Sequence, residues 1–174
     1  MINSLTDLIT KLKKTDPKDF PKITKQINIL ASEFENYIYW CDESYTRNCI
    51  ERTENFELML LCWNNKQATP IHDHGGEKCW VYQISGTVDE VRYKENENGQ
   101  LEVDHKMTLK PGALTYMDDN MGYHALENNK DSKALTLHLY MKPIDECEVF
   151  NTEEKCFESK ELAYDTHEGE LIEA

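Results

Sequence analysis

From Tyr45 to Met141 the chain is interrupted by turn signals at short, regular intervals, and this spacing restricts the folds open to it. The turns fall at 64–65, 85–86, 96–99 and 111–112, where Asn, Gly, Ser or Pro residues gather. The strand-forming segments between the turns are 56–63, 78–84, 87–93, 101–109, 113–117, 123–127 and 134–141. Short strands at this spacing are typical of an all-β barrel or jelly roll. We therefore predict a mainly β chain with a barrel over 45–150, in which Ser85-Gly86 forms a hairpin turn.

The residues before the barrel follow a helical period. Ser4 and Asp7 form a capping-box pattern, and Pro21 is placed as at the first position of a second helix. The apolar positions at helical spacing are Leu5, Leu8, Ile9 and Leu12 in the first segment and Ile23, Ile27, Leu30 and Phe34 in the second. We predict that these helices, within 1–40, pack as a lid on the barrel.

The length of 174 residues fits one domain with a core of ordinary size. Its parts are an N-terminal helical segment (1–40), the barrel (45–150) and an acidic C-terminal segment (151–174). A strand near Leu162 fits the pattern of the last segment. The sequence leaves open whether this segment wraps the barrel.

Charge and composition exclude several partners. With 19 basic and 33 acidic residues the formal charge is −14, which repels nucleic acid and anionic membranes. No segment has the roughly 20 apolar residues that span a bilayer, and the N-terminus lacks the basic start and apolar core of a signal peptide. The six cysteines are scattered, without a C-x-x-C pair, as for thiols in a reducing compartment. We expect a cytoplasmic monomer that binds neither nucleic acid nor membranes.

Two histidines, His72 and His74, stand two residues apart. Side chains at this spacing on a strand point the same way, so the pair could chelate one metal; a pair of solvated loop imidazoles is the alternative. A third ligand must come from elsewhere in the chain. His105 and His167 lie in polar segments and are expected to be solvated. The remaining candidates are His124, after the Pro111-Gly112 turn, and His138.

His138 lies in the apolar segment 134–141 and shares one face with Thr136 and Tyr140. A histidine inside such a strand is usually a hydrogen-bonded core group. We predict a polar chain Thr136–His138–Tyr140 that points into the barrel.

Taken together, these residues resemble a known family. His72-x-His74, followed by Cys79 and Gly86, looks like the first cupin motif, with Cys79 where most cupins have a metal-binding glutamate. His124-x-x-x-Asn128 looks like the second. The exchange of Glu for Cys resembles the eukaryote-like subgroup of the cysteine dioxygenase family, and so do two further motifs, Tyr45-Thr46-Arg47-Asn48 and Leu137-His138-Leu139-Tyr140. The resemblance runs from Tyr45 to Phe150.

The resemblance implies that His72, His74 and His124 hold Fe(II). A third neutral imidazole, in place of the carboxylate of the usual oxygenase site, leaves the site at +2 and favours an anionic thiolate as the next ligand. Zinc competes for three histidines but has no redox chemistry.

It also implies roles for the residues around the metal. Arg47 would bind a substrate carboxylate through two parallel donors, beside Tyr45 as a pocket wall; a surface ion pair is the alternative for this arginine. Tyr140 would reach the substrate, with its hydroxyl oriented by His138. Cys79 and Tyr140 would become joined by a thioether, whereas a plain buried thiol is the alternative for Cys79.

The function implied is oxidation of L-cysteine by O2 to cysteine sulfinic acid, a step of cysteine catabolism. The rival hypotheses are a dioxygenase for another small thiol such as 3-mercaptopropionate, a non-catalytic metal-binding cupin, and a zinc or manganese isomerase. Enzymes for 3-mercaptopropionate usually lack an arginine at the position of Arg47.

One motif departs from the family. Where the family usually has Tyr-Ser-Pro-Pro with a cis peptide, this chain has Tyr140-Met141-Lys142-Pro143. A cis bond before Lys142 would cost about 3 kcal/mol. We expect either that bond or a different local path near Tyr140.

Overall fold

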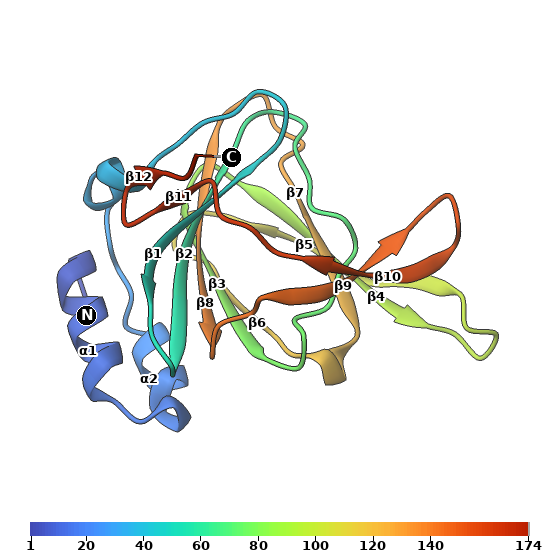
Figure 1. Ribbon diagram of the computed structural model, residues 1–174, viewed down its shortest axis with the longest axis horizontal. Helices are drawn as coiled ribbons and strands as arrows, with labels where there is room; N and C mark the ends of the chain where they lie inside the picture. The colour runs from blue at the N-terminus through green and yellow to red at the C-terminus, as the bar shows by residue number, and fades with distance from the viewer. Residues whose placement is uncertain (174) are drawn as a thin grey trace.

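The computed structural model describes residues 1–173, which form two facing sheets with helices packed on one of them (Figure 1). The larger sheet has seven strands in the order β12-β11-β1-β2-β8-β3-β6. Their bounds are Thr46–Arg52 (β1), Phe56–Trp63 (β2), Lys78–Ser85 (β3), Leu114–Met117 (β6), Ala134–Met141 (β8), Thr166–His167 (β11) and Glu170–Leu171 (β12). This is the predicted mainly β, cupin-type barrel.

The second sheet faces the first and is assembled from three parts. Strands β5-β4-β7 form one part and the hairpin β9-β10 another. Their bounds are Val88–Glu95 (β4), Leu101–Leu109 (β5), Tyr123–Glu127 (β7), Glu146–Asn151 (β9) and Cys156–Glu161 (β10). Isolated bridges from Ala68 to Glu127 and from His72 to both His124 and Val149 place the segment 68–72 between β7 and β9. The first metal motif is therefore part of the barrel wall.

Strand β2 shows why its apolar run is continuous. All its residues are buried, and they alternate between two cores. Leu58 and Leu60 face the helices, whereas Met59 and Leu61 face the barrel interior. A strand covered on both faces needs apolar residues at consecutive positions rather than an alternation with polar ones.

The helices cover the outer face of the large sheet, as predicted. Helix α1 (Leu5–Lys14) begins at Ser4, whose Oγ accepts a hydrogen bond of 3.1 Å from the backbone N–H of Asp7. The remaining helical elements are η1 (Pro17–Asp19), α2 (Phe20–Thr24), η2 (Ala31–Tyr37) and η3 (Asp119–Met121). Leu8 and Phe20 share one apolar core with Leu58 of β2.

The predicted second helical stripe is wrong beyond Thr24, where α2 ends. The backbone of Ile2 accepts from Asn28 N–H and donates to Gln26 C=O, so these groups pair with the N-terminus instead of within a helix. Leu30 is 72 % exposed, whereas Phe34 reaches the core from η2.

The predicted hairpin at Ser85-Gly86 is also wrong. Strand β3 pairs with β6 and β8, whereas β4 pairs with β5 and β7, so the chain crosses from one sheet to the other at this turn. Gly86 has φ of 64°, and a Cβ on it would lie 2.4 Å from the carbonyl oxygen of Lys133. The turn residues suit a hairpin and a crossing equally, because both need a positive φ.

The C-terminal segment lies against the barrel. Strand β11 runs parallel to β1, and β10 ends at Glu161, one residue before Leu162. Asp165 exchanges two hydrogen bonds with the backbone of Arg47: its N–H donates to Arg47 C=O at 2.8 Å, and its Oδ2 accepts from Arg47 N–H at 2.7 Å. This segment therefore wraps the barrel beside a predicted site residue.

Residues 1–173 contain no cis peptide bond, so the peptide before Lys142 is trans and the local path differs from the family pattern. Lys142 takes φ of 71°.

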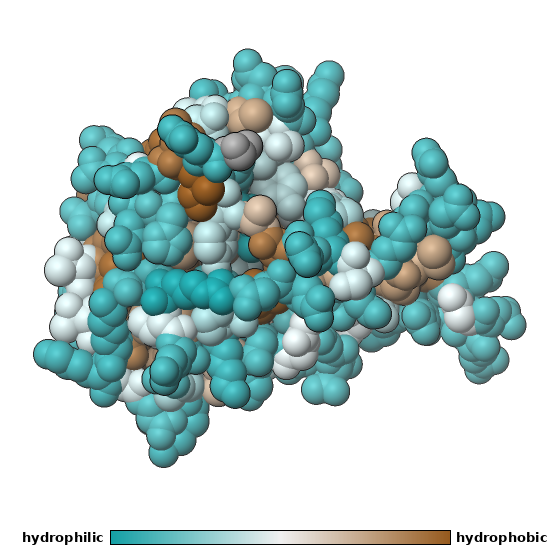
Figure 2. Space-filling model, in the orientation of Figure 1, coloured by the Kyte–Doolittle hydropathy of each residue, from teal (hydrophilic) through white to brown (hydrophobic). Residues whose placement is uncertain are grey.

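Over residues 1–173, every helix is too short or too polar to cross a bilayer. Figure 2 shows a face that is mostly hydrophilic, with an apolar patch beside β12, where Leu171 and Ile172 are exposed.

The crossing at Gly86 predicts a selective loss of stability. Gly86→Ala adds both the left-handed penalty of about 1–2 kcal/mol and a clash with backbone atoms of β8. Gly99→Ala is the matched control, because Gly99 also has positive φ (73°) but its Cβ would meet nothing within 4 Å. We expect Gly86→Ala to lower the free energy of unfolding by about 3 kcal/mol or more, measured by urea denaturation, and Gly99→Ala by about 1 kcal/mol. Equal losses would contradict the close approach.

Candidate metal centre

Three histidines from two segments of the second sheet meet inside the barrel. The ligand atoms of His72, His74 and His124 all lie within 4.8 Å of one another. His72 and His124 face each other across the bridge, where each backbone N–H donates to the other's carbonyl at 3.0 and 3.1 Å. His72 and His74 do not share a regular strand, since only His72 forms a bridge. The structure thus brings together the three residues predicted to bind metal.

Hydrogen bonds at the outer ring nitrogens orient two of these imidazoles. His72 Nδ1 lies 2.8 Å from Pro70 C=O, and His124 Nδ1 lies 2.8 Å from a carboxylate oxygen of Glu90. A carbonyl oxygen and a carboxylate oxygen are acceptors, which suits a proton on each Nδ1. The lone pair of each Nε2 is then free for a metal, as is usual when a second partner orients a metal-binding histidine.

Glu90, on β4, was not found from the sequence. Its carboxylate is fully buried and also accepts from Thr115 Oγ1 at 2.9 Å and from Arg92 Nη2 at 3.3 Å. These donors fix the carboxylate beside His124. The available signal was an acidic side chain between the apolar residues Val88 and Val91.

His74 is held through its backbone. Its N–H donates to Oδ1 of Asp119 at 2.8 Å, and the N–H of Gly76 donates to Oδ2 of the same carboxylate at 2.5 Å. His74 Nδ1 is buried and has no hydrogen-bond partner among residues 1–173. Burial lowers the pKa of His74 and of His124 well below the ordinary value, so both imidazoles are neutral ligands at pH 7.

These observations fit a divalent metal. A buried imidazole nitrogen without a partner is costly unless a ligand satisfies it, and three neutral imidazoles suit Fe(II) or zinc. The cluster contains no carboxylate of its own. A metal bound there keeps its full charge of +2 at the ligand positions.

His138 lies outside the cluster and forms the predicted polar chain. The indole Nε1 of Trp63 donates to Thr136 Oγ1 at 2.9 Å, and this hydroxyl lies 2.9 Å from His138 Nε2. His138 Nδ1 lies 3.4 Å from the hydroxyl of Tyr140. Trp63 was not predicted to take part.

The polar chain favours one tautomer of His138. The indole N–H of Trp63 can only donate to Thr136 Oγ1, which leaves the proton of that hydroxyl available to His138 Nε2. Burial lowers the pKa of His138 well below its ordinary value, and the neutral ring then carries its proton on Nδ1. This proton faces the oxygen of Tyr140, which leaves the O–H of Tyr140 free to donate elsewhere.

Cys79 and Tyr140 are direct neighbours across two strands. They occupy opposite positions in the antiparallel pairing of β3 with β8, and both are buried. Burial raises the pKa of both side chains well above their ordinary values, so the thiol and the phenol are protonated.

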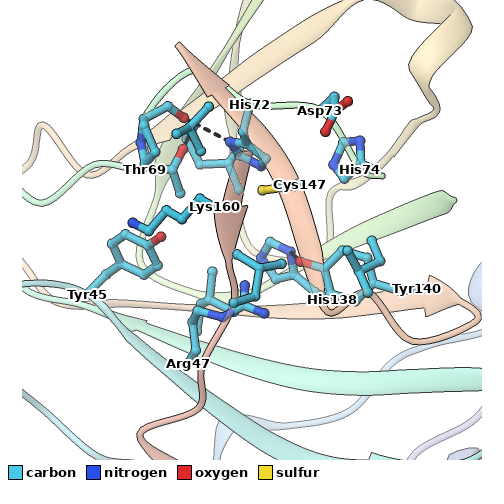
Figure 3. Close-up of a pocket in the computed structure, with 16 residues that line it drawn as sticks. Tyr45, Arg47, Thr69, His72, Asp73, His74, His138, Tyr140, Cys147 and Lys160 are labelled. Carbon is cyan, nitrogen blue, oxygen red and sulfur yellow. Dashed lines mark hydrogen bonds between the residues drawn. The ribbon is translucent and has the colours of Figure 1, made fainter. Parts of the chain in front are cut away.

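A cavity beside the histidines contains most of the remaining predicted residues (Figure 3). Its empty space, the open mouth included, is about 520 Å³. The predicted residues that line it are Tyr45, Arg47, His72, His74, His138 and Tyr140. Cys147, Lys160 and Leu162 also line it and were not predicted. His124 and Cys79 lie behind these walls, in contact with lining residues through the pairings above.

Arg47 keeps part of its guanidinium unused. Its Nε donates to the carbonyl of Ala163 at 3.1 Å, whereas Nη2 is buried and has no hydrogen-bond partner among the described residues. Arg47 forms no ion pair within residues 1–173, so the surface ion pair considered for it is absent there. Tyr45 stacks on Trp63, with ring centroids 4.8 Å apart, and forms the adjacent wall.

The remaining histidines stay apart from the cluster. His105 is exposed on β5. His167 is only half-buried, with its ring centroid 6.0 Å from that of Tyr164.

Sequence comparison relates the chain to one protein family. The family model described as cysteine dioxygenase type I matches residues 1–153. Cysteine dioxygenase type 1 of Rattus norvegicus is 27% identical over 158 residues, covering 85% of this chain and 79% of the relative. The Danio rerio protein of the same name is 28% identical over 160 residues, with the same coverage of 85% and 79%.

Solved structures support the fold. The crystal structure of TT1209 from Thermus thermophilus has a TM-score of 0.50 and 21% identity, covering 63% of this chain and 95% of that one. A Klebsiella pneumoniae protein with a double-stranded β-helix domain also has a TM-score of 0.50, at 14% identity, covering 74% of this chain and 94% of that one.

The cluster predicts binding of one divalent metal. His124→Ala removes one of three ligands, and we expect bound iron to fall at least about tenfold, since even outer partners of metal ligands are typically worth 10–100-fold in affinity. Iron content after anaerobic loading, measured by elemental analysis with circular dichroism as a check on folding, tests this. His105→Ala is the control, because His105 is exposed and outside the cluster. Full iron occupancy in folded His124→Ala protein would remove His124 from the site.

Proposed function

The chain belongs to the type I cysteine dioxygenase family, and from this premise we propose that it is a non-haem Fe(II) enzyme converting L-cysteine and O2 to cysteine sulfinic acid. One observation carries the proposal. A buried, unpartnered nitrogen of Arg47 lines the same cavity as His72 and His74. That combination suits a small molecule with a metal-binding group and a carboxylate.

His72, His74 and His124 would hold the metal. When bound there, Fe(II) supplies the redox chemistry with O2 that the protein side chains lack. Since all three donors are neutral, the site favours an anionic ligand such as a thiolate. Cys79, kept protonated by burial, does not compete with the substrate thiolate.

Arg47 would bind the substrate carboxylate. Its Nε is held by Ala163, and the free Nη2 donor is available to a carboxylate oxygen. Because the guanidinium is anchored before the substrate arrives, little further side-chain entropy is lost on binding. Arg47 thereby orients the substrate so that its sulfur faces the histidines.

Tyr140 would donate a hydrogen bond to the substrate or to O2. With the proton of His138 on Nδ1, the oxygen of Tyr140 accepts from His138, and the O–H of Tyr140 is available to a ligand in the cavity. His138 and Thr136 act as positioning residues, because they contact Tyr140 directly or through each other. Burial raises the pKa of Tyr140, which keeps the phenol a donor at neutral pH.

We further propose that residues 1–174 act as one cytoplasmic, monomeric domain. All six cysteines are free thiols, as suits a reducing compartment. The helices share one core with the barrel.

Removing the carboxylate clamp tests the function. Arg47→Ala should lower kcat/KM for L-cysteine at least about 30-fold, since loss of one partner of a buried charge pair costs about 2–5 kcal/mol. Cysteamine, which has no carboxylate, should be affected much less. The measurement is O2 uptake by iron-loaded protein, with the sulfinic acid product identified by mass spectrometry.

Arg47→Lys serves as the graded control, because it keeps the positive charge but lacks the paired donors of a guanidinium. Its kcat/KM for L-cysteine should lie between those of the wild type and Arg47→Ala. Unchanged kinetics of Arg47→Ala on L-cysteine would remove this role. Absence of O2 uptake by the iron-loaded wild type with L-cysteine would reject the proposed function itself.

We also propose that a thioether joins Cys79 Sγ to a ring carbon of Tyr140. Their direct opposition on β3 and β8 supports this. The new carbon–sulfur bond replaces one S–H and one C–H bond, and O2 accepts the two electrons and two protons. The link restricts Tyr140 and so reduces the entropy lost in placing its hydroxyl.

Intact mass and peptide mapping test the link. The mass should fall by about 2 Da for each link. A disulfide would give the same shift, but a reducing compartment disfavours disulfides. The linked fraction should rise during turnover of L-cysteine in air. Cys79→Ser should abolish the link and reduce the rate, whereas Cys147→Ser, a second buried cysteine at the cavity, should retain it. Recovery of Cys79 and Tyr140 only on separate, unmodified peptides after many turnovers would refute the link.

A further inference from the structure

We propose that Lys160 is a specificity-determining residue: a second cation at the cavity that, with Arg47, favours thiols carrying carboxylates over thiols without one. The inference rests on the proposed function, because it concerns the same cavity. It adds a residue on β10, which lies outside the residues 1–153 that match the family model. The substrate class it implies includes small thiols with two carboxylates.

The first observation is the position of Lys160. It lines the cavity together with Tyr45 and Arg47 and lies opposite Cys147 in the pairing of β9 with β10. Figure 3 shows its side chain extending on the Tyr45 side of the cavity, away from Tyr140. Arg47 and Lys160 therefore occupy separate places around one space.

The second observation is that the ammonium group of Lys160 is available. Within residues 1–173 it forms no side-chain hydrogen bond and no ion pair, although the chain has 33 acidic residues and 19 basic ones. Many other lysines are paired with carboxylates, among them Lys13 with Glu51 and Lys94 with Asp104. An unpaired cation beside an arginine on a cavity wall can attract an anionic group of a ligand.

The third observation is that both cations act on one point of the cavity wall. Burial and the Asp73 carboxylate raise the pKa of Cys147 to about 11, whereas the charges of Arg47 and Lys160 both act to lower it. Cys147 lines the cavity, so the field of Lys160 reaches the space that a ligand would fill. A carboxylate placed there interacts with two positive charges.

These features predict the size of the effect. Lys160 is exposed, so solvent and salt screen its charge and the gain in affinity is modest. A thiol with one carboxylate, already held by Arg47, should gain little from Lys160. A thiol with a second carboxylate should gain more, since that group has no other cation lining the cavity.

Binding measured without turnover tests the proposal. The iron-loaded protein is titrated under nitrogen by calorimetry with L-cysteine, cysteamine and mercaptosuccinate, a thiol with two carboxylates. Lys160→Gln should weaken mercaptosuccinate about tenfold and L-cysteine about two- to threefold, in the range of single charge contacts. Binding of cysteamine, which carries a positive charge, should be unchanged or slightly stronger. The losses should shrink at high salt.

Lys110→Gln is the matched control. Lys110 is an exposed lysine in the turn between β5 and β6, away from the cavity, and its side chain makes no hydrogen bond or ion pair within residues 1–173. The Lys110→Gln substitution removes the same single positive charge as Lys160→Gln, so an effect of total charge alone would appear in both variants. Equal affinities of Lys160→Gln and Lys110→Gln for all three thiols would overturn the role of Lys160.

The two proposals fail separately. If L-cysteine binds but is not oxidised in air, the dioxygenase function is rejected, while the comparison of the lysine variants still decides the role of Lys160. If L-cysteine is oxidised and the two lysine variants match, only the role of Lys160 is rejected. If the iron-loaded wild type binds none of the three thiols, both proposals are rejected.

Discussion

Strand β8 is buried on both faces, and the arrangement of the site depends on this constraint. Its outward residues, such as Leu137, pack under the helices, so its inward residues face the barrel interior, where water is scarce. The inward residues Thr136, His138 and Tyr140 are polar and must satisfy one another there. Their hydrogen bonds, extended by Trp63 of β2, leave one donor, the O–H of Tyr140, for a ligand. The hydrogen bonds that satisfy these buried polar side chains thus leave the hydroxyl of Tyr140 available to a ligand in the cavity.

The same barrel separates charge from metal ligands. The three imidazoles are neutral, and the carboxylates of Glu90 and Asp119 stand one hydrogen bond behind His124 and the backbone of His74. This arrangement orients the imidazoles and would place no carboxylate on a metal bound there. A strongly acidic chain can therefore keep a site that attracts anions, because the local groups rather than the net charge determine the field in a cavity.

The C-terminal segment completes the cavity from outside the matched region. Ala163 holds the guanidinium of Arg47, Asp165 holds its backbone, and Lys160 adds a second cation. Under the proposed function, changes in this segment would alter which thiols bind while the histidines and the polar chain of β8 remain as they are.

Local periodicity and motif chemistry were readable from the sequence. The period of two on 134–141 identified the shared face of Thr136, His138 and Tyr140, since alternation is a property of any strand. Turn spacing indicated the barrel, and the histidine motifs identified the three residues that cluster. The apolar pattern of a strand does not, however, indicate which other strands pair with it. The Ser85-Gly86 turn therefore suggested a hairpin where the chain changes sheets, and the closeness of Cys79 to Tyr140 was expected from the family resemblance rather than from the strand pattern.

Only the tertiary structure decided which distant groups meet. Glu90 behind His124, and Lys160 on the same cavity as Arg47, come from segments far apart in the chain, and their placement follows from strand order and register. The end of α2 at Thr24 was likewise decided by hydrogen bonds to the N-terminus that no helical period contains. The sequence by itself determined which side chains face inward and which chemistry they carry. Packing determined their partners, because the contacts that select them are long-range.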